Sequence, residues 1–279
     1  MITVNSLSGG KTSSYMAIKY PANINVFSLV RTNDKKVIFP DKKIRQIVSD
    51  KIGKDFVGTL EMDDIIYTML DLEQMMGIGI NWLSPFTFEE VIQNSGGYLP
   101  NKVKRICTVK MKVEPIAQWL YEIGATVCDM RIGFRANEMR RAKNMIERAD
   151  ENGIEYFKFK VGQSESGRNK WKTLPYRKTT FPLIENAIFK DTIQEYWKNK
   201  PVRFAYMNNC VGCFHRNPIL LKHMSNKSPK QFDWFIDTEK RSKGTFKSGL
   251  KYEQIKNFKT QLELFDDDFN ECDSGYCGL

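Results

Sequence analysis

The first part of the chain alternates between short apolar runs and longer segments with helical periodicity. The apolar runs are typical of strands buried in a sheet, and they fall at residues 2–7, 23–30, 55–61, 126–134 and 155–161. Apolar residues three or four positions apart predict helices at 11–20, 41–53, 63–77, the second part of 104–124, and 137–153. Strands separated by helix-length segments predict an α/β fold with a doubly wound, mainly parallel sheet and helices on both faces. Sheets of this kind bind ligands at the carboxyl ends of their strands.

The pattern changes at about residue 163. Residues 163–183 are polar, basic and aromatic, which predicts a loop over a site, and helical patterns follow at 191–200, 218–224, 228–241 and 249–265. We therefore divide the chain into an α/β nucleotide-binding domain at 1–162 and a helical, cysteine-containing part at 163–279 that is continuous with it.

Charge and composition narrow the classes of partner. The formal net charge of +10 favours an anionic partner, either a phosphorylated small molecule or a nucleic acid. A hydrophobic content of 41% fits a globular protein, and no segment reaches the roughly 18 apolar residues that a membrane span requires. The first residues lack a basic flank followed by an apolar run, so we expect no secretory signal, no membrane partner and a cytoplasmic location.

Residues 5–14, NSLSGGKTSS, connect the first predicted strand to the first predicted helix. A Walker A motif is excluded because Asn5 stands where that motif needs its first glycine. Glycines at this turn let backbone amides approach a pyrophosphate at the positive end of a helix. The residues that would bind phosphate there are Ser8, Gly9, Gly10, Lys11, Thr12 and Ser13. The alternative is an ordinary strand-to-helix turn with a Ser or Thr cap.

This turn resembles the PP-loop, usually SGGxDS, of the adenine-nucleotide alpha-hydrolase superfamily. Further stretches resemble one branch of that superfamily, the phosphoadenosine phosphosulfate (PAPS) reductase family. They are RICTVKMKVEPI at 105–116, GFRANEMRR at 133–141, FPLIENAIFKDTIQEYW at 181–197 and NCVGCF at 209–214, in the family's order. The sequence departs from the pattern at Thr12, where many PP-loop ATP pyrophosphatases carry aspartate. This departure puts ATP cleavage in doubt, although not nucleotide binding.

The resemblance implies an enzyme that binds an adenine nucleotide, either ATP or a sulfonucleotide (PAPS or APS). It implies sulfonucleotide reduction with a thiol reductant. A second version is ATP-dependent sulfur insertion into nucleic acid, as in DNA phosphorothioation or tRNA thiolation. A third interpretation is a catalytically inactive protein on the PP-loop scaffold that binds nucleic acid or has a regulatory role. Basic residues embedded in the family-like segments would contact the nucleotide, and we name Lys110, Arg135 and Arg140, with Lys11 also acting in catalysis.

Six cysteines in a chain of 279 residues indicate metal binding or redox chemistry more than structural disulfides. Cys210 and Cys213 form a Cys-x-x-Cys pair, and one such pair is an incomplete site. The resemblance adds Cys107, which permits a [4Fe–4S] cluster with one tail cysteine. A zinc site is equally permitted, and its ligands would be Cys210, Cys213, Cys272 and Cys277.

The last three residues, Cys277-Gly278-Leu279, resemble the C-terminal E-C-G-[LI]-H tail of PAPS reductases without its glutamate and histidine. The resemblance implies that Cys277 is a catalytic nucleophile, which would form a thiosulfonate with a bound sulfonucleotide. A metal-ligand role for Cys277 excludes that use. Cys128 lies inside an apolar strand and is expected to be an inert core thiol.

Overall fold

The computed structural model describes residues 1–242 and 244–259, which form two compact units that we describe separately. Unit 1 comprises Met1–Phe27, Met69–Asn81 and Glu114–Val202. Unit 2 comprises Ser28–Thr68, Trp82–Val113 and the described residues from Arg203 onward. Each unit is therefore assembled from three stretches of chain. The boundary that we predicted at residue 162 falls inside a strand of unit 1.

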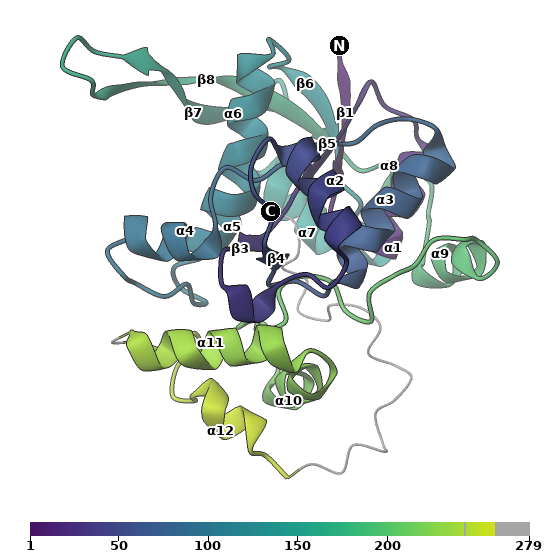
Figure 1. The fold of residues 1–279 in the computed structure, drawn as a ribbon. Coiled ribbons are helices and arrows are strands. Elements are labelled where there is room, and N and C mark those ends of the chain that lie inside the picture. The colour runs from purple at the N-terminus through teal and green to yellow at the C-terminus, as the bar shows by residue number, and fades with distance from the viewer. Residues whose placement is uncertain (243, 260–279) are drawn as a thin grey trace. The chain divides into compact units, whose positions relative to one another are not determined.

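A six-stranded sheet has the order β5-β2-β1-β6-β8-β7 (Figure 1). Its strands are β1 (Thr3–Leu7), β2 (Ile24–Ser28), β5 (Asn81–Leu83), β6 (Cys128–Arg131), β7 (Ile154–Gln163) and β8 (Asn169–Thr180). Strand β1 pairs in parallel with β2 and β6, and β6 pairs in parallel with β8. Strand β7 pairs antiparallel with β8 at the edge of the sheet. The predicted α/β class with a mainly parallel, Rossmann-like sheet is confirmed.

Helices flank this sheet in unit 1. They are α1 (Lys11–Lys19), α6 (Glu114–Glu122), α7 (Met139–Ile146), α8 (Pro182–Glu185) and α9 (Lys190–Trp197), with a 3-10 turn η3 at Ala136–Glu138. Helix α1 packs on β1, α9 packs on α1, and α6 packs on β7. Helix α3 (Asp64–Met76) begins in unit 2 and ends in unit 1.

Strand β1 is fixed by apolar burial and by one buried polar group. Val4 and Leu7 are buried, as the apolar pattern predicts. Asn5 is also fully buried, and its amide Nδ2 donates to Tyr20 O at 3.0 Å and to Asn25 Oδ1 at 3.2 Å. These bonds tie β1 to the residue that follows α1 and to β2, which sets where the chain turns after β1.

Unit 2 is mainly helical. Its elements are β3 (Arg31–Thr32), η1 (Lys35–Val37), α2 (Lys42–Ile52), β4 (Gly58–Thr59), α4 (Phe88–Asn94), α5 (Ile106–Thr108), the π-helical turn η2 (Val109–Val113), α10 (Pro218–Lys227), α11 (Pro229–Arg241) and α12 (Tyr252–Lys256). Helices α10, α11 and α12 pack on one another. Buried aromatic rings form the centre of this core, where Phe232 stacks on Tyr252 with ring centroids 5.4 Å apart.

Two predictions of secondary structure are wrong. The strand predicted at 55–61 is reduced to β4, which pairs antiparallel with β3 outside the main sheet. Gly58 passes so close to η1 that a Cβ atom would lie 1.9 Å from Val37 O. The segment 163–183, predicted to be a loop, contains β8. Backbone pairing with β7 forms this strand, although the side chains of β8 do not alternate between apolar and polar.

Among the described helices, none combines the length and the apolar character needed to cross a membrane.

Candidate functional site

The turn between β1 and α1 is formed by two glycines, and it leads into a helix without a side-chain cap. Gly9 has φ 75°, in the left-handed region that favours glycine. Gly10 is the N-cap of α1 in an extended conformation, and no side chain caps the helix. The first amides of a helix lack intrahelical acceptors and lie at the positive end of its dipole. An anion at this turn would therefore meet backbone donors rather than a capping side chain.

Ser13 shapes this turn from inside. Its buried hydroxyl donates to Gly10 O at 3.2 Å and accepts from the amide of Ser8 at 3.2 Å. Ser8 Oγ also lies 3.1 Å from Ser13 Oγ. Ser13 was predicted to contact phosphate, but in the structure its hydroxyl bonds to Ser8 and Gly10 of the turn itself. Thr12 is half-buried on the first turn of α1.

Lys11 is the first residue of α1, and its carbonyl is held by a second helix. The indole Nε1 of buried Trp197, on α9, donates to Lys11 O at 2.9 Å. This bond fixes the first turn of α1 against α9. Trp197 lies in the segment 181–197, which resembles the PAPS reductase family. Its bond to Lys11 O explains why a tryptophan stands at this position. Sequence reasoning did not assign Trp197 to the site.

The segment after β6 comes to the same turn, because β6 is the parallel neighbour of β1. A Cβ atom on Gly133 would lie 3.3 Å from Ser13 Cα and 3.4 Å from Ser13 N. Only a residue without a side chain fits this approach without a shift of the neighbouring backbone. The glycine of the segment GFRANEMRR therefore lies directly against the first turn of α1.

Arginines follow Gly133, and a single carboxylate organises two of them. Glu138 Oε2 accepts from the amide of Arg135 at 2.9 Å and from its Nε at 3.1 Å. Glu138 Oε1 accepts from Arg141 Nη1 at 2.5 Å, and the Arg141 guanidinium lies 4.1 Å from the centroid of the Phe134 ring. Arg135, predicted to contact the nucleotide, pairs with Glu138. Arg140 is exposed.

Sequence reasoning missed Glu138 and Arg141. The signal that could have found this cluster is the spacing: one arginine stands three residues before Glu138 and another stands three residues after it. Lys110, the remaining predicted nucleotide contact, is exposed on η2 in unit 2, whereas the turn and the two arginines belong to unit 1.

The three described cysteines of the predicted metal set all belong to unit 2. Cys107 is on α5, and Cys210 forms an isolated antiparallel bridge with Glu61. Cys213 N donates to Cys210 O at 3.1 Å, which makes the Cys-x-x-Cys segment a tight turn. Gly212 in this turn lies against Phe235, and a Cβ atom there would be 2.5 Å from the ring. The packing therefore requires glycine between the two cysteines.

A buried ion pair adjoins these thiols. Glu61 is 1% exposed, and Lys112 Nζ lies 3.1 Å from its Oε1. Burial raises the pKa of Cys107 to about 11, and Cys213 adds to this rise. Burial raises the pKa of Cys210 well above its ordinary value, and the charge of Glu61 raises it further. Lys112 opposes both shifts. Burial thus favours the neutral form of the Cys107 and Cys210 thiols.

The described cysteines do not by themselves make a metal centre. Among residues 1–242 and 244–259, no three His, Cys, Asp or Glu side chains are arranged to hold a metal ion. Cys272 and Cys277, which the prediction also needs, lie outside the described residues. We therefore derive no reaction step through a metal. Cys128 is fully buried in β6, as expected of a core thiol, and burial raises its pKa to about 11.

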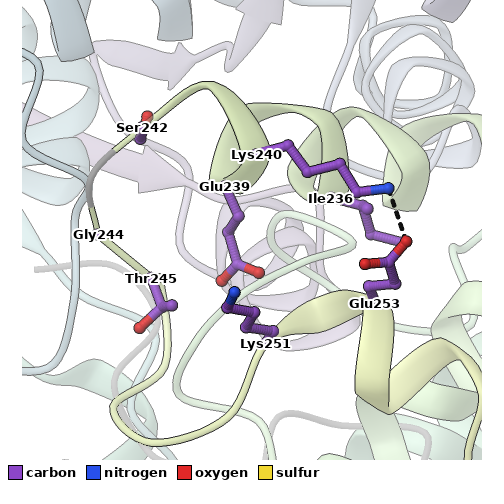
Figure 2. Close-up of a pocket in the computed structure, with 8 residues that line it drawn as sticks. All are labelled: Ile236, Glu239, Lys240, Ser242, Gly244, Thr245, Lys251 and Glu253. Atoms are coloured by element: carbon purple, nitrogen blue, oxygen red, sulfur yellow. Dashed lines mark hydrogen bonds and ion pairs between the residues drawn. The ribbon is translucent and has the colours of Figure 1, made fainter.

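A pocket in unit 2 lies between the end of α11 and α12 (Figure 2). Both carboxylate oxygens of Glu239 accept backbone amides there, from Phe246 at 2.9 Å and from Tyr252 at 2.8 Å. Lys240 and Glu253 form an ion pair of 2.6 Å at its edge. None of the predicted site residues lines this pocket. Its polar groups hold the loop before α12, which gives the pocket a structural role.

Comparison of the chain with protein-family models, with curated proteins and with solved structures finds no match.

Proposed function

We propose that this protein is a PP-loop enzyme of the PAPS reductase type that binds an adenine nucleotide at the β1–α1 turn. The observation that carries the proposal is the turn itself, in which Gly9 and Gly10 lead into a helix whose N-terminus has no side-chain cap. The close approach of Gly133 to Ser13 supports it, because a second family-like segment meets the same turn. Lys11 and the Arg135 segment would add positive charge around the phosphates.

The reaction that we favour is reduction of a sulfonucleotide. The thiolate of Cys277 would attack the sulfonate sulfur, so that a Cys–S–sulfonate bond forms and the sulfur–oxygen bond to the nucleotide phosphate breaks. The nucleotide would leave with the electron pair of that bond. A dithiol reductant would then release sulfite, restore the thiol of Cys277 and become a disulfide. Cys277 lies outside the described residues, and its role derives from the resemblance of the chain end.

ATP-dependent sulfur insertion is the second candidate, and the Gly9-Gly10-Lys11 sequence of the turn favours it. In this reaction the enzyme would adenylate an acceptor and release pyrophosphate. The outer sulfur of a cysteine persulfide would then displace AMP, and a thiol reductant would cleave the resulting disulfide to release the product. Thr12 argues against ATP cleavage, because many ATP pyrophosphatases with this loop carry aspartate at that position.

The two reactions release different products, so one assay separates them. The protein is incubated anaerobically with PAPS and a dithiol, or with ATP and a candidate acceptor, and sulfite and pyrophosphate are measured. We expect sulfite from PAPS, and no sulfite from the Cys277→Ser variant. Pyrophosphate from ATP without sulfite from PAPS would instead favour sulfur insertion. Release of neither product, from protein that binds neither nucleotide, would reject the enzymatic proposal.

A further inference from the structure

The β7–β8 hairpin of unit 1 carries a basic and aromatic face. Its register places Lys160 opposite Trp171, Lys158 opposite Thr173, and Tyr156 opposite Pro175. Successive side chains of a strand point to opposite faces, so Tyr156, Lys158, Lys160 and Trp171 share one face. We call these four residues the hairpin face. Figure 1 shows the β7–β8 hairpin extending past α6 and away from the other strands of the sheet.

The opposite side of the hairpin is held by α6. Phe159 is fully buried and stacks on Tyr121 of α6 with ring centroids 5.0 Å apart. Gln118 of α6 accepts from the amide of Lys160 at 3.0 Å and donates to its carbonyl at 3.1 Å. These contacts fix the orientation of the strand, so the hairpin face is turned away from α6 on a supported scaffold.

The hairpin face exposes large aromatic surface beside positive charge. Trp171 is 50% exposed and Tyr156 is 53% exposed. Lys158 and Lys160 supply the positive charge of this face, and at its other end the Tyr156 hydroxyl donates to the Asp150 carboxylate. Lysines alone are common on an edge strand such as β7, where they prevent pairing with another sheet. The pairing of β8 with β6 covers only Arg177–Thr180, so β8 pairs with β7 alone at Trp171. Charged side chains are what protects such an edge, and an exposed tryptophan does not serve that purpose.

We propose that the hairpin face binds single-stranded nucleic acid. Exposed rings stack on bases that are free of a duplex, and lysines beside them neutralise phosphates. A duplex hides the faces of its bases, so Trp171 and Tyr156 would add nothing to duplex binding. The partner is therefore a single strand of DNA or RNA, bound through its bases and its backbone together.

This interaction goes beyond nucleotide binding at the β1–α1 turn and does not depend on it. The hairpin face contains none of the residues assigned to the nucleotide. Loss of ATP or PAPS binding would leave the hairpin proposal intact, and loss of nucleic-acid binding would leave the proposed enzyme intact.

The test is fluorescence anisotropy of the full chain with labelled oligo(dT) and oligo(U) of about 20 nucleotides, and with a duplex of the same length. Titrations at increasing salt give the slope of log K against log[salt]. The variants are Trp171→Ala and the double variant Lys158→Gln/Lys160→Gln. The matched control is Lys170→Gln/Lys172→Gln. Lys172 pairs with Phe159, and Lys170 lies two positions before Lys172 on β8, so both lysines lie on the face of β8 opposite to Trp171. Far-UV circular dichroism and thermal unfolding confirm that each variant folds.

We expect Trp171→Ala to weaken single-strand binding at least about fivefold with an unchanged salt slope, because stacking is not electrostatic. Lys158→Gln/Lys160→Gln should weaken binding and reduce the slope by about 1.4, at roughly 0.7 per phosphate. The control should lose less affinity than either variant. The proposal would be overturned by any of four results: no binding of either single strand to the wild type, wild-type affinity in both variants, an equal loss in the control, or a preference for the duplex.

Discussion

Gly133 lies so close to Ser13 that a Cβ atom on it would be 3.3 Å from Ser13 Cα. The two residues are 120 positions apart in the sequence, and each belongs to a separate family-like segment. Their contact joins the turn after β1 to the segment after β6. Ser13 in turn holds Ser8 and Gly10 through its hydroxyl. The geometry of the candidate site therefore depends on the absence of a side chain at position 133.

Gly133→Ala should displace the first turn of α1. Overpacking of this kind costs about 1–3 kcal/mol of unfolding free energy. Urea unfolding measures this cost, and the same variant should bind ATP and PAPS more weakly. Gly79→Ala is the matched control, because a Cβ atom there would meet nothing within 4 Å. Equal stability and equal nucleotide affinity in the two variants would show that the close contact between Gly133 and Ser13 is not important.

Removal of Lys112 should strongly destabilise unit 2. Its ammonium group pairs with Glu61, which is 1% exposed, and Oε2 of Glu61 has no other partner among the described residues. Lys112→Met leaves a buried carboxylate unpaired, which costs about 3 kcal/mol. Glu61→Gln removes that charge, so the double variant Glu61→Gln/Lys112→Met should recover part of the loss. A double-mutant cycle in urea measures the coupling, and strictly additive effects would show that the pair is not coupled.

The contribution of Asp63 to the stability of the protein should fall as pH rises between about 4 and 6. Burial raises the pKa of this carboxyl from 3.8 to about 6, and Asp64 adds to the rise, although Gln231 Nε2 donates to it at 3.1 Å. In this window the unfolded chain ionises Asp63 while the folded protein keeps the proton, so the free energy of unfolding decreases with pH. The full shift corresponds to about 3 kcal/mol at most.

Asp63→Asn keeps the acceptor for Gln231 and removes the titration. Relative to wild type, the variant should therefore be more stable at pH 7 than at pH 4, by about 1–3 kcal/mol. Urea unfolding of both proteins across this range measures the difference. Asp50→Asn changes an exposed aspartate of α2 and serves as the control. A difference between Asp63→Asn and wild type that does not vary with pH would contradict the expected shift.

We expect a metal to bind in one of two ways. One tail cysteine joins Cys107, Cys210 and Cys213 around a [4Fe–4S] cluster, or Cys272 and Cys277 join Cys210 and Cys213 around zinc, and the zinc site would exclude Cys277 as the nucleophile. Anaerobic purification followed by absorbance and metal analysis should find one centre per chain. Iron with labile sulfide indicates a cluster, and colourless protein with one zinc indicates a structural site. Cys210→Ser/Cys213→Ser should lose the metal in either case, whereas Cys128→Ser, in the core of β6, should retain it. Wild-type protein without stoichiometric metal would reject the prediction.

The sequence predicts the first part of the fold well, because apolar runs and helical periods are local. Strand β1, helix α1 and the glycine turn between them lie where the pattern places them. Strand β5 was missed because three residues carry too little pattern. Strand β8 was missed because its sequence does not alternate between apolar and polar side chains. Its extended conformation depends on backbone hydrogen bonds to β7, which the sequence of β8 does not show.

The candidate site follows the same division. Gly9 and Gly10 could be predicted, since a tight strand-to-helix turn requires them locally. The pairing of Glu138 with Arg135 and Arg141 could not, because it depends on how η3 leads into α7 after β6. The bond from Trp197 to Lys11 also depends on tertiary packing, namely that of α9 on α1.

Equilibrium binding of ATP and PAPS to wild type and to the Lys11→Met variant, by isothermal titration calorimetry, tests the central claim most directly. The account predicts saturable binding of one nucleotide per chain, weaker binding of adenosine, and at least about tenfold lower affinity in Lys11→Met, because a charged contact to phosphate is lost. Equal affinity of wild type and variant, or no binding of either nucleotide to folded wild-type protein, would contradict it.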